Sequence, residues 1–181
     1  MAVVRGLYTV DLLKDQRLSI MGHPAGGALL EQAIKMLRSA GVDVLVSLLT
    51  GEEIEEIGLQ HEAQTCREQG VRYFHFPIAD LQGPPLDGAI QDLLSELYGL
   101  LSAGHHIAIH CRLGIGRSAM IAAALLVRAG YSVPLAVGLL SSARGCFVPQ
   151  TATQLEWIEA LERYYRQQGQ PFLDDAGAEL D

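Results

Sequence analysis

The sequence predicts a single α/β domain whose central, mostly parallel sheet is flanked by helices. Short apolar runs around residues 17–22, 42–49, 71–78 and 105–110 alternate with segments of helical periodicity. This alternation indicates parallel strands joined by crossover helices. The run at 42–49 is apolar almost throughout, as expected for a strand that is covered on both faces. A chain of 181 residues is long enough for one well-buried domain and short for two.

The helices are predicted from apolar spacing and from their end signals. Thr50 and Glu53 have the T-x-x-E spacing of a capping box, and Asp87 stands where it can cap the helix that follows a Pro- and Gly-rich loop. Helical segments are expected over 27–40, just after Thr50, over 59–69, after Asp87, and over 117–129, 133–143 and 150–168. Residues 1–168 are therefore expected to form one domain, and the acidic segment 169–181 to form a flexible tail.

Composition excludes several classes of function. The net charge is −8, with an isoelectric point near 5.2, which argues against a nucleic-acid or anionic-membrane partner. The three cysteines suggest no disulfide framework, their spacing matches no zinc site, and the start of the chain lacks the apolar core of a signal peptide. We therefore expect a cytoplasmic protein that needs no metal or cofactor.

The stretch HCRLGIGRS, residues 110–118, follows a predicted strand and opens a predicted helix. Backbone N–H groups of a glycine-containing loop can converge on an anion, and the helix N-terminus adds its own positive end. An arginine such as Arg117 can hold two phosphate oxygens at once. The loop predicts a binding site for a tetrahedral dianion, held by backbone and side-chain donors of Arg112, Leu113, Gly114, Ile115, Gly116 and Arg117.

The same loop begins with Cys111, which has the setting of a nucleophile. Thiols at a helix N-terminus beside arginine titrate between roughly 3.5 and 7.5 rather than near 8.5, so that thiolate dominates at neutral pH. Attack on a bound phosphate would give a phosphocysteine intermediate. His110 and Ser118 are expected to support the loop or the sulfur by hydrogen bonds.

These residues resemble the signature H-C-x5-R-[ST] of the cysteine-dependent tyrosine and dual-specificity phosphatases. The resemblance covers about residues 40–165. The segment FPIADLQGPP is similar to the P-I-x-D segment of the kinase-associated phosphatases, which implies that Asp80 is the general acid; Asp87 is the competing assignment. The segment VPQTATQ is similar to the family's Q-T-x-x-Q stretch, which implies that Gln150 orients the hydrolytic water, with Gln154 as the second candidate.

The resemblance implies a metal-independent phosphomonoester hydrolase, most active on the acidic side of neutral pH. No K-N-R-Y-like segment is present, which favours a small, shallow dual-specificity type over a tyrosine-specific enzyme. The expected partner is a phosphorylated protein carrying phosphotyrosine or phosphoserine/threonine. A phosphoinositide or small-molecule phosphatase, a rhodanese-like sulfurtransferase and a non-catalytic phosphoprotein-binding module are the alternatives, although the rhodanese loop is one residue shorter.

Overall fold

The computed structural model describes residues 6–12 and 16–173, which form a five-stranded sheet with helices on both faces. The strands are β1 (Tyr8–Asp11), β2 (Arg17–Gly22), β3 (Val44–Ser47), β4 (Arg72–His75) and β5 (Ile107–Cys111). The helices are the 3₁₀ turn η2 (Gly27–Leu29), α1 (Leu30–Ser39), α2 (Gly51–Ile57), α3 (Glu62–Glu68), α4 (Gly88–Ser102), α5 (Arg117–Arg128), α6 (Val133–Arg144) and α7 (Ala152–Gln167). The predicted fold class is confirmed.

The strand order is β1-β2-β5-β3-β4, and all neighbours are parallel except the edge pair β1 and β2. The antiparallel strand β1 is absent from the sequence prediction. It is only four residues long, and while Val10 is buried, Tyr8 and Thr9 are half-buried, so it lacks the continuous apolar run that predicts the central strands. β5 lies in the middle of the sheet, and its carboxyl end carries Cys111.

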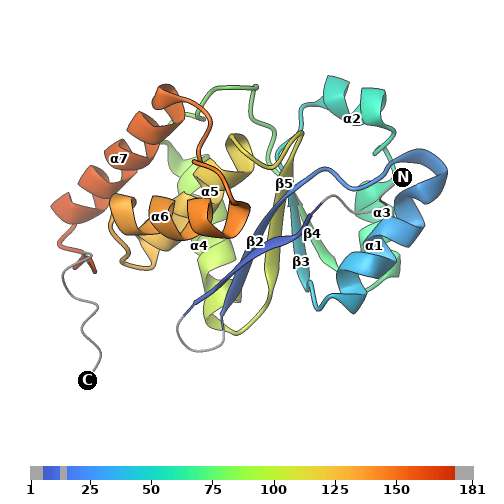
Figure 1. Ribbon diagram of the computed structural model, residues 1–181, viewed down its shortest axis with the longest axis horizontal. Coiled ribbons are helices and arrows are strands. Elements are labelled where there is room, and N and C mark those ends of the chain that lie inside the picture. Colours follow the sequence, from blue (N-terminus) through green and yellow to red (C-terminus); the bar gives the residue numbers. More distant parts are fainter. Residues whose placement is uncertain (1–5, 13–15, 174–181) are drawn as a thin grey trace.

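The helices divide between the two faces of the sheet (Figure 1). α4, α5, α6 and α7 cover one face, and α1 and α3 cover the other, with α2 above the carboxyl ends of the strands. Alternate residues of β5 point to opposite faces. Ile107, Ile109 and Cys111 therefore pack into the core under α5, whereas Ala108 packs toward α1 and α3. By the same alternation, His110 lies on the face opposite Cys111.

The helix ends follow the local signals closely. The capping box of Thr50 and Glu53 is present, and Asp87 caps α4 by accepting hydrogen bonds from two backbone amides. The helix expected from residue 150 begins at Ala152, because Thr151 is its N-cap and forms a capping box with Gln154. No helix in the described part of the chain is long and apolar enough to cross a membrane.

The chain beyond α7 returns to the end of α5. The Leu173 N–H donates to the Gly130 carbonyl at 2.6 Å, and the Leu173 carbonyl accepts from Ser132. The predicted tail began at residue 169, so its first residues are placed against the domain. Residues 174–181 lie outside the described residues.

Candidate active site

The loop of residues 111–117 joins β5 to α5 and lies against the carboxyl end of β2. Gly114 adopts a positive φ of +72°, and a Cβ there would stand 2.5 Å from the Met21 carbonyl carbon and 2.6 Å from the Gly22 nitrogen. Only glycine meets both conditions at low cost. The tight approach fixes the loop to the neighbouring strand, and this fixes where its amide groups lie.

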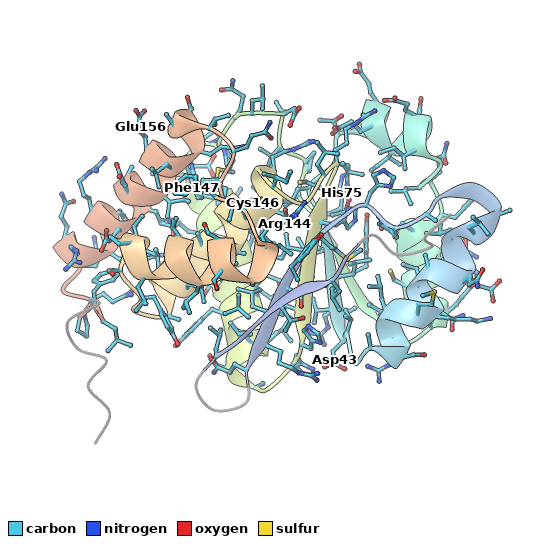
Figure 2. The ribbon with its side chains drawn as sticks, in the orientation of Figure 1. Asp43, His75, Arg144, Cys146, Phe147 and Glu156 are labelled. Carbon is cyan, nitrogen blue, oxygen red and sulfur yellow. The ribbon has the colours of Figure 1, made fainter. Side chains whose placement is uncertain are left out.

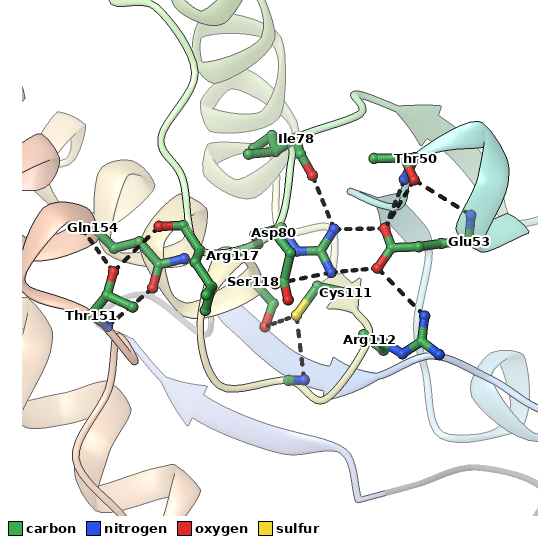
Figure 3. A network of polar contacts seen from close by, with 12 residues as sticks. Thr50, Glu53, Ile78, Asp80, Cys111, Arg112, Arg117, Ser118, Thr151 and Gln154 are labelled. Carbon is green, nitrogen blue, oxygen red and sulfur yellow. Dashed lines mark hydrogen bonds and ion pairs between the residues drawn. The ribbon is translucent and has the colours of Figure 1, made fainter.

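Cys111 is buried at the base of this loop. Its Sγ lies 3.4 Å from the Gly114 amide nitrogen and 3.4 Å from the Ser118 hydroxyl oxygen, and both groups can donate a hydrogen bond to a thiolate (Figure 3). Ser118 is itself fully buried in the first turn of α5. The structure thus places the predicted nucleophile beside a helix N-terminus and two donors.

Arg117 begins α5, and its side chain is 1% exposed. Its two terminal nitrogens donate to the carboxylate of Glu53 at 2.7 and 2.8 Å, and one of them also donates to the Ile78 carbonyl at 2.9 Å (Figure 3). The Nε atom is buried and has no hydrogen-bond partner among the described residues. The guanidinium is therefore fixed in place with one buried donor left over.

Glu53 is a site residue that the sequence predicts only as part of a capping box. Its carboxylate accepts from the Thr50 backbone within the box and from Arg117, which lies 64 residues away. The hydrogen bond from Arg117 lowers the pKa of Glu53 to about 2, although partial burial opposes this. Burial likewise disfavours the charge of Arg117, but Glu53, Cys111 and Asp80 outweigh it and raise the pKa of this arginine.

Asp80 lies at the mouth of the site, and its side chain is 63% exposed. One carboxylate oxygen stands 3.3 Å from a terminal nitrogen of Arg117. The loop that carries Asp80 is anchored from α7, because Trp157 Nε1 donates to the Pro84 carbonyl at 2.6 Å. Asp87, the competing acid, is engaged as the N-cap of α4. Of the two aspartates, Asp80 is the one that lines the cavity with Cys111.

Gln150 precedes α7 and faces the same cavity. Its amide oxygen would stand 3.3 Å from a Cβ at Gly116, whereas both amide atoms of Gln154 would be closer still, at 3.0 and 3.1 Å. Gln154 is fully buried, and its Oε1 accepts from Thr151 in the capping box. Gln150 is exposed. Gln150 is therefore the more accessible of the two glutamines, whereas Gln154 keeps a buried Nε2 without a hydrogen-bond partner in the described part of the chain.

The other side chains of the loop differ in their exposure and contacts, and one arginine from α6 also contacts the loop. Leu113 is 54% exposed, and Ile115 packs on the core under α5. Arg112 forms an exposed ion pair with Glu56 at 2.7 Å, so its side chain is turned toward α2. Arg144 donates from Nε to the Gly114 carbonyl at 3.1 Å and lies over the Tyr8 ring, at the end of α6 seen in Figure 2.

These residues surround a small cavity of about 60 Å³ lined by Asp80, Cys111, Arg112, Leu113, Gly116, Arg117 and Gln150. Among residues 6–12 and 16–173, no group of three or more metal-ligating side chains could hold a metal ion. A wider groove of about 660 Å³ lies between α6 and α7, and neither Cys111 nor Arg117 lines it. The chemistry that the residues support is centred on the smaller cavity.

Comparison with known proteins identifies the family. The family model described as "Polymorphic toxin system, DSP-PTPase phosphatase" matches residues 20–131, more than half of the chain. Cyclin-dependent kinase inhibitor 3 of Rattus norvegicus is 28% identical over 124 residues, which are 67% of this chain and 58% of that protein. The Homo sapiens protein of the same name is 27% identical over 124 residues, which again are 67% of this chain and 58% of that protein. The chain thus matches less than two thirds of the length of these relatives.

Solved structures agree with the fold. A crystal structure of kinase-associated phosphatase, with its catalytic-site cysteine replaced by serine, has a TM-score of 0.78 at 20% identity, covering 92% of this chain and 98% of that one. The active form of Tk-PTP has a TM-score of 0.69 at 23% identity, covering 85% and 96%. The chain belongs to the family described as DSP-PTPase phosphatases of polymorphic toxin systems, and it shares the fold of these phosphatase structures.

Proposed function

We propose that the protein hydrolyses phosphorylated protein side chains through a phosphocysteine intermediate on Cys111. The observation that carries this proposal is the 60 Å³ cavity in which Cys111, Asp80 and Arg117 meet. The buried, unpartnered Nε of Arg117 supplies a donor for which a bound phosphate oxygen is the natural acceptor. The loop amides and the N-terminus of α5 supply the remaining positive field.

In the first step, the Cys111 thiolate attacks phosphorus, so that a P–S bond forms and the ester P–O bond breaks. Arg117 and the loop amides hold the non-bridging oxygens, and Asp80 gives its proton to the leaving oxygen. In the second step, water held by Gln150 attacks phosphorus and passes a proton to Asp80, and the P–S bond breaks. The Ser118 hydroxyl, 3.4 Å from Sγ, stabilises the departing thiolate.

The size and surroundings of the cavity favour a protein substrate. A cavity of about 60 Å³ admits a phosphate-sized group and leaves the rest of the substrate on the surface. Arg112 is paired with Glu56, and Glu53 and Asp80 add further negative charge beside the loop. A second phosphate, as in a polyphosphorylated inositol lipid, would meet these acids. Phosphotyrosine and phosphoserine/threonine both fit a shallow site, and we propose a phosphoprotein of either kind as the substrate.

The three cysteines are free, and the proposed nucleophile acts only in its reduced form. A reducing compartment such as the cytoplasm is therefore the setting that the proposal requires. Cys66 is buried in α3, where burial and the nearby Glu62 raise its pKa to about 12, so it is a poor nucleophile beside Cys111. Cys146 is exposed after α6.

Rapid-quench hydrolysis of p-nitrophenyl phosphate tests the proposal. The wild type should release a burst of nitrophenol and form a phosphoprotein that mass spectrometry locates on Cys111. Cys111→Ser should abolish turnover, and Arg117→Ala should lower kcat/KM by about 10³-fold or more. Asp80→Asn should lower kcat by about 10²-fold or more, whereas the matched cap variant Asp87→Asn should retain it.

Wild-type turnover by Cys111→Ser would overturn the mechanism. A normal Asp80→Asn with a slow Asp87→Asn would show that the acid is wrongly assigned. A panel of phosphotyrosine, phosphoserine and phosphothreonine peptides with identical flanks then ranks the substrates by kcat/KM.

A further inference from the structure

A buried polar cluster lies behind the catalytic loop, on the face of the sheet opposite Cys111. Its members are Glu62 from α3, Tyr73 from β4 and His110 from β5, and we call it the Glu62 cluster. The side chains of Glu62 and His110 are both 0% exposed, and His110 Nε2 stands 3.0 Å from Glu62 Oε1. The Tyr73 hydroxyl donates to the other carboxylate oxygen at 3.0 Å. Nothing in the proposed chemistry uses Glu62.

A fully buried carboxylate is costly unless a cation or several donors compensate it. The polar groups that face Glu62 are Tyr73 on β4, Cys66 one turn along α3, and His110 on β5. His75, farther along β4, is exposed and bonded to the Leu49 carbonyl, and α1 presents apolar side chains to this core. Among the described residues, His110 is the basic side chain at ion-pair distance from Glu62.

The Tyr73 hydroxyl and the Cys66 thiol lie close enough to Glu62 for its carboxylate to affect their pKa. The pKa of Tyr73 is raised, first by burial and then by Glu62, and the pKa of Cys66 is raised by the same two causes in the same order. Neither ring nitrogen of His110 has a hydrogen-bond partner in the described part of the chain, so the ion-pair contact of Nε2 with Glu62 Oε1, at 3.0 Å, is the polar contact through which the ring can be held. A buried imidazole with no acidic partner gives up its proton.

We propose that Glu62 is a positioning residue that keeps His110 as an imidazolium with a fixed ring, so that a buried positive charge stands directly behind Cys111. Glu62 does not touch substrate and acts only through His110, whose backbone continues into the nucleophile. The charge favours the thiolate at the base of the loop and adds to the field of Arg117 and of the α5 N-terminus. The inference rests on the proposed function, in which that thiolate is the reacting group.

Two measurements on the full chain test this role. Nitrogen NMR of the His110 ring, assigned by comparison with His110→Asn, should show both ring nitrogens protonated at neutral pH in the wild type and a neutral ring in Glu62→Gln. In the pH profile of kcat/KM for p-nitrophenyl phosphate, the ascending limb of Glu62→Gln should move up by about one pH unit, which lowers activity on that limb roughly ten-fold. The pH at which the ultraviolet absorbance of the thiolate appears should rise by a similar amount in Glu62→Gln.

The controls separate this role from a merely structural one. Glu68→Gln changes an exposed acid on the same helix, and it should leave the ring and the pH profile unchanged. Tyr73→Phe removes one hydrogen-bond donor to Glu62, and it should move the ascending limb of the pH profile upward by less than Glu62→Gln does. Glu62→Asp keeps the carboxylate and should recover part of the activity that Glu62→Gln loses. A neutral His110 ring in the wild type would overturn the proposal even if Glu62→Gln failed to fold. An unmoved profile in folded Glu62→Gln would also overturn it.

NMR and thiolate absorbance need no turnover. A chain that proved inactive on every phosphate ester would contradict the proposed function, yet the ring and the thiolate would still report whether Glu62 acts through His110.

Discussion

Glu53 receives one hydrogen bond on each carboxylate oxygen from the two terminal nitrogens of Arg117, at 2.7 and 2.8 Å. The same carboxylate closes the capping box at the start of α2. A single side chain therefore fixes a helix end and the guanidinium at the base of the cavity. Because Glu53 occupies both terminal nitrogens, the Nε edge of Arg117 is the edge left for a ligand.

Glu53→Gln should destabilise the protein at neutral pH by on the order of 3 kcal/mol, because it leaves a buried arginine without its counter-charge. The folded-state pKa of Glu53 is about 2, below its ordinary value of 4.5. Its contribution is therefore fully present above pH 4.5 and is lost as the pH falls toward 2. Urea unfolding across this range should show the wild type and Glu53→Gln converging in acid. Glu52→Gln, at an exposed neighbouring position, should stay close to the wild type throughout, and a gap that is constant with pH would contradict the assignment.

Gly114→Ala should destabilise the fold by about 2 kcal/mol or more and lower kcat/KM by roughly 10²-fold, because the new Cβ meets the backbone of Met21 and Gly22. Gly99→Ala is the matched control. It lies on the exposed face of α4 with open space around it and should stabilise the protein by about 0.5–1 kcal/mol. Thermal unfolding and p-nitrophenyl phosphate kinetics measure both. Normal activity in Gly114→Ala would show that the loop does not depend on this close approach.

Arg112→Ala should change kcat/KM for p-nitrophenyl phosphate by no more than about five-fold, because its side chain is exposed and committed to Glu56. In the proposed mechanism Arg112 contributes its backbone amide to the phosphate, and this group remains in the variant. Kinetics on a singly and a multiply phosphorylated substrate provide the check. A large loss confined to the multiply phosphorylated substrate would instead assign Arg112 to a second phosphate.

Trp157→Phe should affect poor leaving groups more than good ones, because Trp157 anchors the Asp80 loop through the Pro84 carbonyl. A leaving group that needs protonation depends on where the acid stands. We expect kcat for phenyl phosphate to fall roughly ten-fold more than kcat for p-nitrophenyl phosphate. Tyr164→Phe, an exposed change on the same helix, should leave this ratio unchanged. Equal losses on both esters would mean that the anchor serves stability alone.

The central strands, the loop and most helix ends were predictable because their signals are local. An apolar run, a glycine after a strand and a Thr or Asp before a helix act within a few residues. The partners of Arg117 and His110 were not predictable in this way. Glu53 and Glu62 lie far from them in sequence, and the pairs form only when α2 packs over the strand ends and α3 packs on the face of the sheet. As a sequence feature, Glu62 is one more acid on a short polar helix.

The edge strand β1 was missed for a related reason. Its four residues have no apolar run that predicts a strand, and they are extended because they pair with β2. The Gln150 assignment came from the resemblance of VPQTATQ to the family's Q-T-x-x-Q stretch, and α7 begins at Ala152, so Gln150 lies outside the helix and lines the cavity. For β1 the missing information was its pairing partner rather than its residue types.

The contacts that Arg144 makes with the loop and with β1 matter for the design of shorter fragments of this protein. Arg144 joins the Gly114 carbonyl to the Tyr8 ring of β1, whereas the family match starts only at residue 20. A fragment cut at that boundary would lose the aromatic surface under Arg144 and one edge of the sheet. Domain limits taken from the family alone would thus remove a support of the loop, and a fragment intended for assay or crystallisation should begin before Tyr8.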